Sequence, residues 1–357
     1  MMNGVSNNKK ENGKTEKLGG DNMDKNLYET LEQDIITAEL SEKEKNKMLK
    51  NLMKLKNDKV GIMITGATGC GKSSTINALF DMEVAKVGVG VDPETMEIEK
   101  YKLNNLELWD SPGLGDGKEA DNRHAINIIK KLSEIDENGN AVIDLVLVIL
   151  DGGSRDLGTS YELINQVIIP NLRENSRILV AINQADVAMK GRYWNKDKNR
   201  PEPRLVEFLE EKVKSVKERI YEATGVEVDP IYYSAGYKEE GEEQSRPYNL
   251  SKLLYYIVQM TPEAKRHVYA NDTVNHKEEM WKDDDEILDY GKETRKSILE
   301  SVVEGASKGA DIGGEIGSIF GTVGEKIGRV AGGFIGGVIE CVKNIPKIFS
   351  GGLFGRI

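Results

Sequence analysis

The sequence predicts an α/β domain built on a mainly parallel sheet. From Lys59 onward, short apolar runs of strand length alternate with longer segments whose apolar residues recur at helical spacing. The first of these strands runs directly into a glycine-rich turn that is followed by a helix. Such an alternation is typical of parallel sheets covered by helices, with ligands bound at the carboxyl ends of the strands.

The apolar patterns and the turn residues between them predict six strands and five helices in this domain. The predicted strands are Val60–Thr65, Glu97–Leu103, Leu106–Trp109, Ile143–Leu150, Ile178–Ile182 and Pro230–Ser234. The predicted helices are Lys72–Phe80, Ala120–Ile135, Thr159–Asn171, Leu205–Thr224 and Asn249–Met260.

The remaining chain divides by composition into flanking segments. Residues 1–24 are polar and predict a disordered leader, and residues 25–57 predict two short helices, the second opened by a Ser41–Glu44 capping box. Pro262 closes the α/β domain of residues 58–262, and 263–300 predicts a charged helical linker. A glycine-rich helical segment with a basic end completes the chain over 301–357.

Bulk composition excludes several classes of protein. A net charge of −11 disfavours broad nucleic-acid binding, which needs a positive field, so we do not expect RNA or ribosome binding. Two cysteines far apart form no disulfide framework and indicate a reducing compartment. The longest uncharged apolar run near the C-terminus, residues 330–339, is too short to span a bilayer. We therefore expect a cytoplasmic protein, or one held peripherally on the inner face of a membrane.

The turn after the first strand has the spacing of a phosphate-binding loop. Its pattern is a glycine, four residues, then Gly-Lys-Ser, between a strand and a helix. The phosphate-binding residues are predicted to be Gly66, Ala67, Thr68, Gly69, Cys70, Gly71, Lys72, Ser73 and Ser74. Lys72 is expected to reach the β- and γ-phosphates and Ser73 to bind Mg²⁺, while Cys70 is expected to contribute its backbone rather than a redox-active thiol.

Two later strands end in groups suited to the same nucleotide. Asp110 follows the third strand and is placed to hold a Mg²⁺-bound water, and the Gly113 N–H is placed to sense the γ-phosphate. After the fifth strand comes Asn183-Gln184-Ala185-Asp186, in which the Asp186 carboxylate can accept from guanine N1–H and N2–H₂ together. Adenine lacks both donors, so the sequence predicts GTP and GDP as ligands rather than ATP.

The base edge is predicted to be closed by the loop after the last strand. This loop is Ser234-Ala235-Gly236, and its backbone groups complete the predicted guanine-binding set of Asn183, Gln184, Asp186, Ser234, Ala235 and Gly236.

These four motifs, in this order, resemble those of the translation-factor-related P-loop GTPases, nearest to the Era-like and ribosome-binding GTPase branch of bacterial proteins. The resemblance covers roughly residues 58–262 and implies a Ras-like six-stranded domain with Mg²⁺–GTP chemistry. It also implies that Thr95 is the switch threonine, a ligand of Mg²⁺ and a sensor of the γ-phosphate. Lys72, Thr95 and Gly113 are then the residues expected to act in catalysis.

Three positions depart from the family pattern. Gln184 stands where a lysine is usual, and Gly236 ends a loop that usually ends in lysine. Leu114 follows Gly113 where Ras-type proteins orient water with glutamine, so we expect slow intrinsic hydrolysis. His124, on the next helix, is expected to be solvated rather than catalytic.

Two functions remain open from the sequence. One is a GTP-hydrolysing switch that acts on a protein partner. The other is a nucleotide-gated protein that self-assembles or contacts a membrane through residues 305–357, where glycines recur every four residues on one helical face. Residues 305–357 could instead pack on their own α/β domain, in which case they would contact neither another copy nor a membrane.

Overall fold

The structure, a computed structural model, describes most of the chain. The residues described are 27–80, 98–113, 117–173, 177–237, 245–270, 273–312 and 315–327. The predicted leader, Thr95, Leu114 and the basic C-terminal end lie outside these residues.

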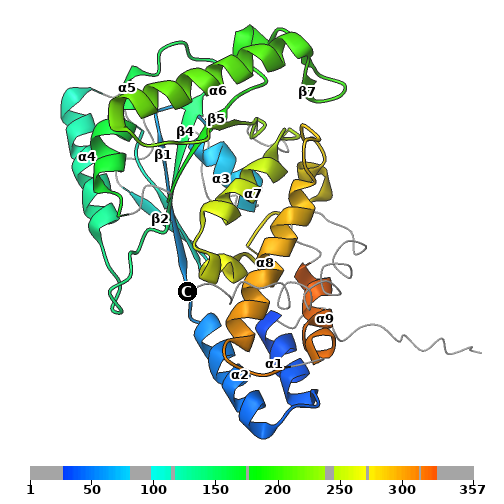
Figure 1. The fold of residues 1–357 in the computed structure, drawn as a ribbon. Helices are drawn as coiled ribbons and strands as arrows, with labels where there is room; N and C mark the ends of the chain where they lie inside the picture. The colour runs from blue at the N-terminus through cyan, green and yellow to red at the C-terminus, as the bar shows by residue number, and fades with distance from the viewer. Residues whose placement is uncertain are drawn as a thin grey trace, which may run out of the picture.

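A single six-stranded sheet organises the domain (Figure 1), in the order β2-β3-β1-β4-β5-β8. The strands are β1 (Val60–Gly66), β2 (Glu99–Leu103), β3 (Leu106–Asp110), β4 (Leu145–Asp151), β5 (Ile178–Asn183) and β8 (Ile231–Tyr232). All neighbours pair in parallel except β2, which runs antiparallel to β3 at the edge. This arrangement confirms the predicted fold class.

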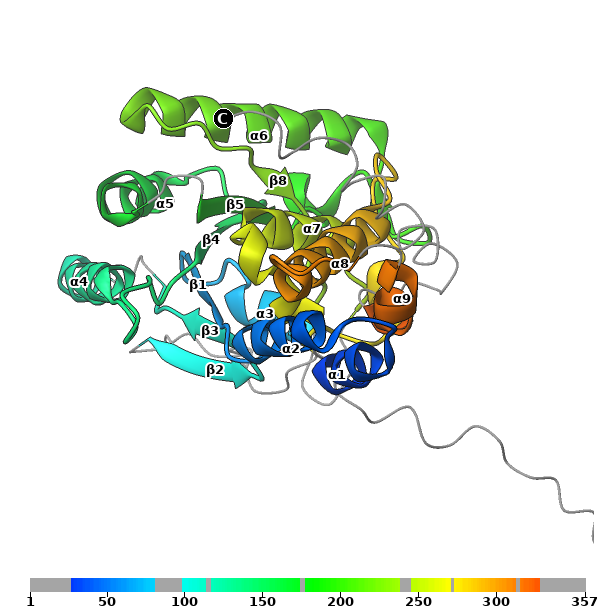
Figure 2. The same ribbon diagram turned by 60° about the horizontal axis from the view of Figure 1, so that its bottom comes forward.

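Helices cover both faces of the sheet (Figure 2). The helices of this domain are α3 (Lys72–Phe80), α4 (Lys118–Ser133), α5 (Gly158–Glu162), α6 (Pro203–Thr224) and α7 (Leu250–Met260). Helices α3 and α7 pack on one face, and α4, the segment after α5 and α6 pack on the other. Because both faces are covered, β1, β4 and β5 are buried nearly throughout, as expected for central parallel strands.

One predicted helix is interrupted. Residues 159–171 form α5, then a π-helical turn over Leu163–Ile168 and a 3₁₀ turn over Ile169–Asn171. Pro170 lies in the last turn and lacks a backbone N–H, so a regular α-helix cannot continue through it. The loop after β5 also carries a small hairpin of β6 (Trp194–Asn195) and β7 (Arg200–Pro201).

Four helices from the two ends of the described chain pack together beside the sheet domain, and we call them the helical appendage (Figure 1). They are α1 (Leu27–Thr37), α2 (Glu42–Leu55), α8 (Tyr290–Ser307) and α9 (Ile316–Ile327). The predicted cap is confirmed, since the Glu44 N–H donates to Ser41 Oγ. None of the helices within the described residues has the length and hydropathy of a membrane span.

Side-chain amides and close packing join α2 to the end of α8. The Asn51 side-chain amide donates to the carbonyls of Ala306 and Lys308, each at 3.0 Å. A Cβ on Gly305 would lie 2.7 Å from Leu55, so glycine at this position allows the two helices to approach closely.

Two glycines of α9 are not explained by close approach of another helix in the described chain. At Gly317 and Gly321 on α9, an added Cβ would meet none of the described atoms within 4 Å. The opposite side of α9 is apolar and buried through Ile319, Phe320 and Val323. The described part of the glycine segment therefore packs on its own chain by its apolar side.

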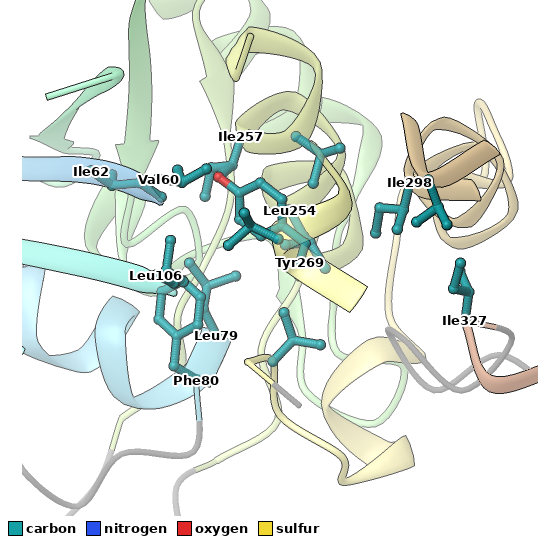
Figure 3. Close-up of a cluster of buried hydrophobic side chains, with 14 of the residues drawn as sticks. Val60, Ile62, Leu79, Phe80, Leu106, Leu254, Ile257, Tyr269, Ile298 and Ile327 are labelled. Atoms are coloured by element: carbon teal, nitrogen blue, oxygen red, sulfur yellow. The ribbon is translucent and has the colours of Figure 1, made fainter. Parts of the chain in front are cut away.

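The hydrophobic core runs from the sheet into the appendage (Figure 3). Residues 263–300, predicted as a charged linker, include the 3₁₀ segments Glu263–Ala270 and Glu278–Trp281 and the first part of α8. Tyr269 and Ile298 from this stretch lie in the same buried cluster as Val60 of β1 and Ile327 of α9. Buried apolar residues are interspersed among the charged side chains, so this segment packs on the sheet domain and the appendage.

His267 lies at the centre of this junction and is fully buried. Its Nε2 lies 3.2 Å from the Leu55 carbonyl, which can only accept, so the ring is the Nε2–H tautomer. Burial lowers the pKa of His267 to about 4, the bonds to the Leu55 and Ala264 backbones oppose that shift, and Lys265 adds to it. Asp58 lies 3.7 Å from Nε2, and burial raises its own pKa.

We predict acid destabilisation that depends on His267. The unfolded chain binds a proton at a pH near 6.5 and the folded chain only near 4, so stability from this group is complete above 6.5 and is lost as the pH falls toward 4. The free energy of unfolding of the parent is expected to fall by about 3 kcal/mol more than that of His267→Gln across this window. Urea unfolding at several pH values measures it, with exposed His276→Gln as the control; equal slopes for parent and His267→Gln would contradict the prediction.

Candidate nucleotide-binding site

The phosphate loop lies between β1 and α3 and depends on glycines with left-handed or unusual backbone angles. Gly69 and Gly71 have φ angles of +80° and +90°. A Cβ on Gly71 would lie 2.2 Å from the Asn183 side-chain nitrogen, and one on Gly66 would lie 2.2 Å from the Ile149 carbonyl oxygen. The loop is therefore pressed against β4 and β5, and only glycine fits at these points.

Lys72 begins α3 and folds back over the loop. Its Nζ lies 3.3 Å from the Gly66 carbonyl oxygen and 3.5 Å from that of Ala67. Ser73 and Ser74 follow in the first turn of the same helix, where backbone N–H groups lack intrahelical acceptors. A cation, two hydroxyls and the N–H groups of a first helical turn thus gather at one helix N-terminus, as anion binding requires.

Asp110 ends β3 beside the loop, paired in register with Ile64 of β1. The side chain is 2% exposed, and its Oδ1 has no hydrogen-bond partner among the described residues. Burial raises the pKa of Asp110 to about 6, with Lys72 opposing the shift and Glu99 adding to it. A buried carboxylate oxygen without a donor fits a cation or a cation-bound water, so this position suits Mg²⁺.

Gly113 lies directly on the phosphate loop. A Cβ at Gly113 would lie 2.6 Å from the backbone nitrogen of Thr68. The turn after β3 therefore reaches the loop at backbone distance, which is where a γ-phosphate sensor is needed. The predicted switch residue Thr95 and the departure at Leu114 lie outside the described residues.

Asn183 connects the phosphate loop to the predicted guanine loop. Its side-chain nitrogen donates to the Cys70 carbonyl at 3.0 Å, and its oxygen accepts from the Ala235 N–H at 2.9 Å. The side chain is buried, so both bonds are made away from water and fix the separation of the two loops.

The next residues of the motif also have defined partners. Gln184, at φ +60°, donates its amide to the Gly69 carbonyl at 2.9 Å, so it contacts the phosphate loop despite lacking the charge of lysine. The Ser234 hydroxyl donates to Asp186 Oδ1 at 2.6 Å and orients the carboxylate. The Gly236 N–H in turn lies 3.3 Å from the Ser234 hydroxyl oxygen.

Glycine stands at position 236, where the family usually has lysine, for a steric reason. Its φ is +75°, and a Cβ there would lie 2.1 Å from the Ser245 carbonyl oxygen. Residues 237 and 245 are joined by hydrogen bonds in both directions, from Ser245 N to Tyr237 O and from Tyr237 N to Ser245 Oγ. The loop turns back on itself here, and a lysine would not fit.

The side chains of Cys70 and His124, both considered in the sequence analysis, are buried. Cys70 is buried, and burial raises the pKa of its thiol to about 11, so it is neutral and contributes through its carbonyl. The expectation of a solvated His124 is wrong, because the residue is buried within α4, with 5% of its surface exposed. Its apolar neighbours at helical spacing, Ile128 and Leu132, are buried on the same face of that helix.

The loop after β4 is a part of the site that the sequence did not reveal. Lys212 of α6 donates to the carbonyls of Asp151, Gly152 and Ser154 at 2.7 to 3.0 Å. The Gly152 N–H donates to the Asn183 carbonyl, so this loop supports the guanine motif from behind. Burial lowers the pKa of Lys212. Nothing in the spacing of α6 distinguishes this lysine from its surface lysines.

Comparison with known proteins agrees with this geometry. Residues 61–184 match the family described as 50S ribosome-binding GTPase. Two uncharacterized proteins of Escherichia coli K12 are similar: YkfA is 30% identical over 155 residues, 42% of this chain and 50% of YkfA, and YfjP is 32% identical over 133 residues, 36% of this chain and 42% of YfjP. The chain thus spans half the length, or less, of these curated relatives.

Among solved structures, Toc33 from Arabidopsis thaliana in complex with Mg²⁺ and GMPPNP is 15% identical. The match covers 60% of this chain and 88% of Toc33, with a TM-score of 0.38. A likeness at this TM-score is too slight to argue from.

The loop geometry and the family match over residues 61–184 together support a G domain of the P-loop GTPase kind. In that domain the phosphate loop, Asp110 and the Asn183–Asp186 segment meet at the carboxyl edge of the sheet.

We predict opposite effects of Asp110→Asn on stability and on binding. Because the charge is buried and Lys72 offsets that cost only in part, its removal is expected to raise the free energy of unfolding of the nucleotide-free protein at pH 7 by up to about 3 kcal/mol. The same change removes the gain in GDP affinity that Mg²⁺ gives. The gain in stability is full above pH 6 and declines to nothing as the pH falls to about 3.8, where the carboxyl of the unfolded chain is protonated as well.

Asp284→Asn is the matched control, since burial also raises the pKa of Asp284 to about 6 outside the phosphate loop. It is expected to leave the Mg²⁺ dependence intact. Thermal unfolding and GDP titration with and without Mg²⁺ measure both effects, and an unchanged Mg²⁺ dependence in Asp110→Asn would refute the assignment.

We also predict that Asp186 sets the base preference. Asp186→Asn removes the carboxylate charge that would strengthen the two hydrogen bonds accepted from guanine. The change is expected to weaken GDP binding by about 100-fold, with little change for ADP. Exposed Asp197→Asn serves as the control. Equal affinities of the parent for GDP and ADP would show that the base assignment is mistaken.

Proposed function

We propose that this chain hydrolyses GTP to GDP with Mg²⁺ and acts as a slow molecular switch. The observation that carries the proposal is the convergence of Asp110 Oδ1, buried and without a partner among the described residues, with Lys72 and Gly113 at one end of the phosphate loop. Mg²⁺, held by Ser73 and Asp110 with Thr95 as the expected third protein group, would neutralise charge on the β- and γ-phosphates.

The chain's own residues then have separate tasks. Lys72 Nζ leaves the Gly66 and Ala67 carbonyls for the β- and γ-phosphate oxygens, where its charge stabilises the bridging oxygen as the bond to the γ-phosphate breaks. The Gly113 N–H donates to the γ-phosphate. Release of that bond after hydrolysis frees the turn after β3, which supplies the switch.

Slow turnover is part of the proposal. Leucine at position 114 has no group that can orient the attacking water, and no other residue of the motif replaces it. A protein partner or a change in the switch segments would supply that group. The four motifs favour placement near the Era-like branch, which we propose as the subclass.

A second candidate for the output is nucleotide-gated self-assembly or peripheral membrane contact through residues 305–357. It is supported by α9, where the side bearing Gly317 and Gly321 is left uncovered by the described residues. The proposed location is cytoplasmic, with contact at the inner face of a membrane in this second case. RNA binding is not part of either proposal.

The enzymatic proposal is tested by single-turnover hydrolysis. Parent protein with Mg²⁺ is expected to release phosphate from GTP slowly and not from ATP, whereas Lys72→Ala is expected to lose at least 100-fold in rate. Lys214→Ala, an exposed lysine on α6, should match the parent. Bound GTP that is never hydrolysed, with or without cell extract, would refute the enzyme and leave a binding protein.

The output is tested on the full chain by light scattering and by sedimentation with anionic vesicles, each with GDP and with a non-hydrolysable GTP analogue. A larger particle or vesicle binding only with the analogue favours the second candidate. No change in either measurement, together with turnover stimulated by extract, favours the switch acting on a partner.

A further inference from the structure

A buried tyrosine lies between the guanine loop and the phosphate loop. Tyr233 is fully buried and immediately precedes Ser234. Its hydroxyl lies 2.7 Å from Thr75 Oγ1, and Thr75 Oγ1 donates to the Gly71 carbonyl at 2.8 Å. Because the single threonine proton is used on Gly71, the tyrosine hydroxyl is the donor to the threonine.

The guanine end of this chain of hydrogen bonds is held by backbone. The Tyr233 N–H donates to the Ile182 carbonyl at 2.9 Å, and the Tyr233 carbonyl accepts from the Ala185 N–H at 3.1 Å. These two bonds enclose Asn183 and Gln184 between them. The backbone of Tyr233 is therefore fixed to the guanine motif, and its ring is fully buried.

The phosphate end of the chain is a single peptide plane. The Gly71 carbonyl accepts from the Thr75 N–H at 3.0 Å as well as from its hydroxyl. The Gly71 oxygen and the Lys72 N–H belong to one planar peptide, so fixing the oxygen fixes the direction of that N–H and of the first turn of α3. Gly71 has a φ of +90° and no side chain of its own to hold this orientation.

We propose that Tyr233 is a positioning residue for the phosphate loop, which it fixes from the guanine side through Thr75 and Gly71. The role rests on the proposed nucleotide-binding function and deepens it. Tyr233 does not touch the nucleotide; its hydroxyl keeps the Gly71–Lys72 peptide in the orientation that receives phosphate, so base and phosphate recognition are coupled.

The chain contains a matched control for this contact. Tyr269 is also fully buried, its hydroxyl lies 2.8 Å from Thr261 Oγ1, and Thr261 Oγ1 donates to the Ile257 carbonyl four residues earlier in α7. The chemistry, the burial and the four-residue spacing match those of Tyr233 and Thr75, but Thr261 lies at the C-terminal end of its helix, away from any phosphate loop.

The experiment compares Tyr233→Phe with Tyr269→Phe by thermal unfolding with and without Mg²⁺–GDP, and by the rate of fluorescent GDP release. Both variants are expected to lower the melting temperature of the nucleotide-free protein to a similar extent. Only Tyr233→Phe is expected to shrink the GDP-induced rise in melting temperature and to weaken GDP binding about fivefold, through faster release. Thr75→Val should give the same loss, and the double variant should lose no more than either alone.

The outcomes separate the two levels of the proposal. Parent protein that shows no GDP-induced rise overturns the nucleotide-binding function and the inference with it. A normal parent, with equal GDP responses in Tyr233→Phe and Tyr269→Phe, overturns the inference alone. If Tyr233→Phe does not fold, Thr75→Val decides the matter by the same measurement.

Discussion

The two hydrogen bonds of the Asn183 side chain are the contact on which the nucleotide site depends. One bond reaches the phosphate loop at Cys70 and the other reaches the guanine loop at Ala235. Each loop lies between a strand and a helix and is not held by the sheet ladder, so a buried amide that bonds to both contributes more than an average hydrogen bond. The loop after β4 follows from the same residue, since Gly152 donates to the Asn183 carbonyl.

Around this contact the chain collects groups that are unfavourable for folding alone. Asp110 carries a buried carboxylate oxygen with no hydrogen-bond partner in the described part of the chain, Lys212 has its ammonium group turned inward, and Gly69 and Gly71 have angles that cost backbone entropy. The apolar interiors of β1, β4 and β5 supply the compensating stability. Such a concentration of strained and unsatisfied groups at one edge of an otherwise buried sheet is characteristic of a ligand site.

The helical appendage shares the core of the G domain. His267 donates to the last turn of α2, Asn51 of α2 binds the end of α8, and the apolar side of α9 closes the same cluster. Elements from both ends of the chain thus lie on the face of the sheet that carries α3, the helix that starts at the phosphate loop. The appendage is therefore packed on the same side of the sheet as the helix that follows the phosphate loop.

The sequence by itself determined the parallel sheet, the phosphate loop and the order of the nucleotide motifs. These are local patterns: apolar runs of strand length, a fixed glycine spacing, and polar residues at strand ends that a parallel sheet brings to one edge. Only the tertiary structure decided the burial of His124, the support by Lys212, the steric need for glycine at 236 and the packing of residues 263–300. Each of these depends on contacts between segments far apart in the chain, such as Gly236 with Ser245 or Lys212 with Asp151, and spacing along the sequence does not encode which segments meet.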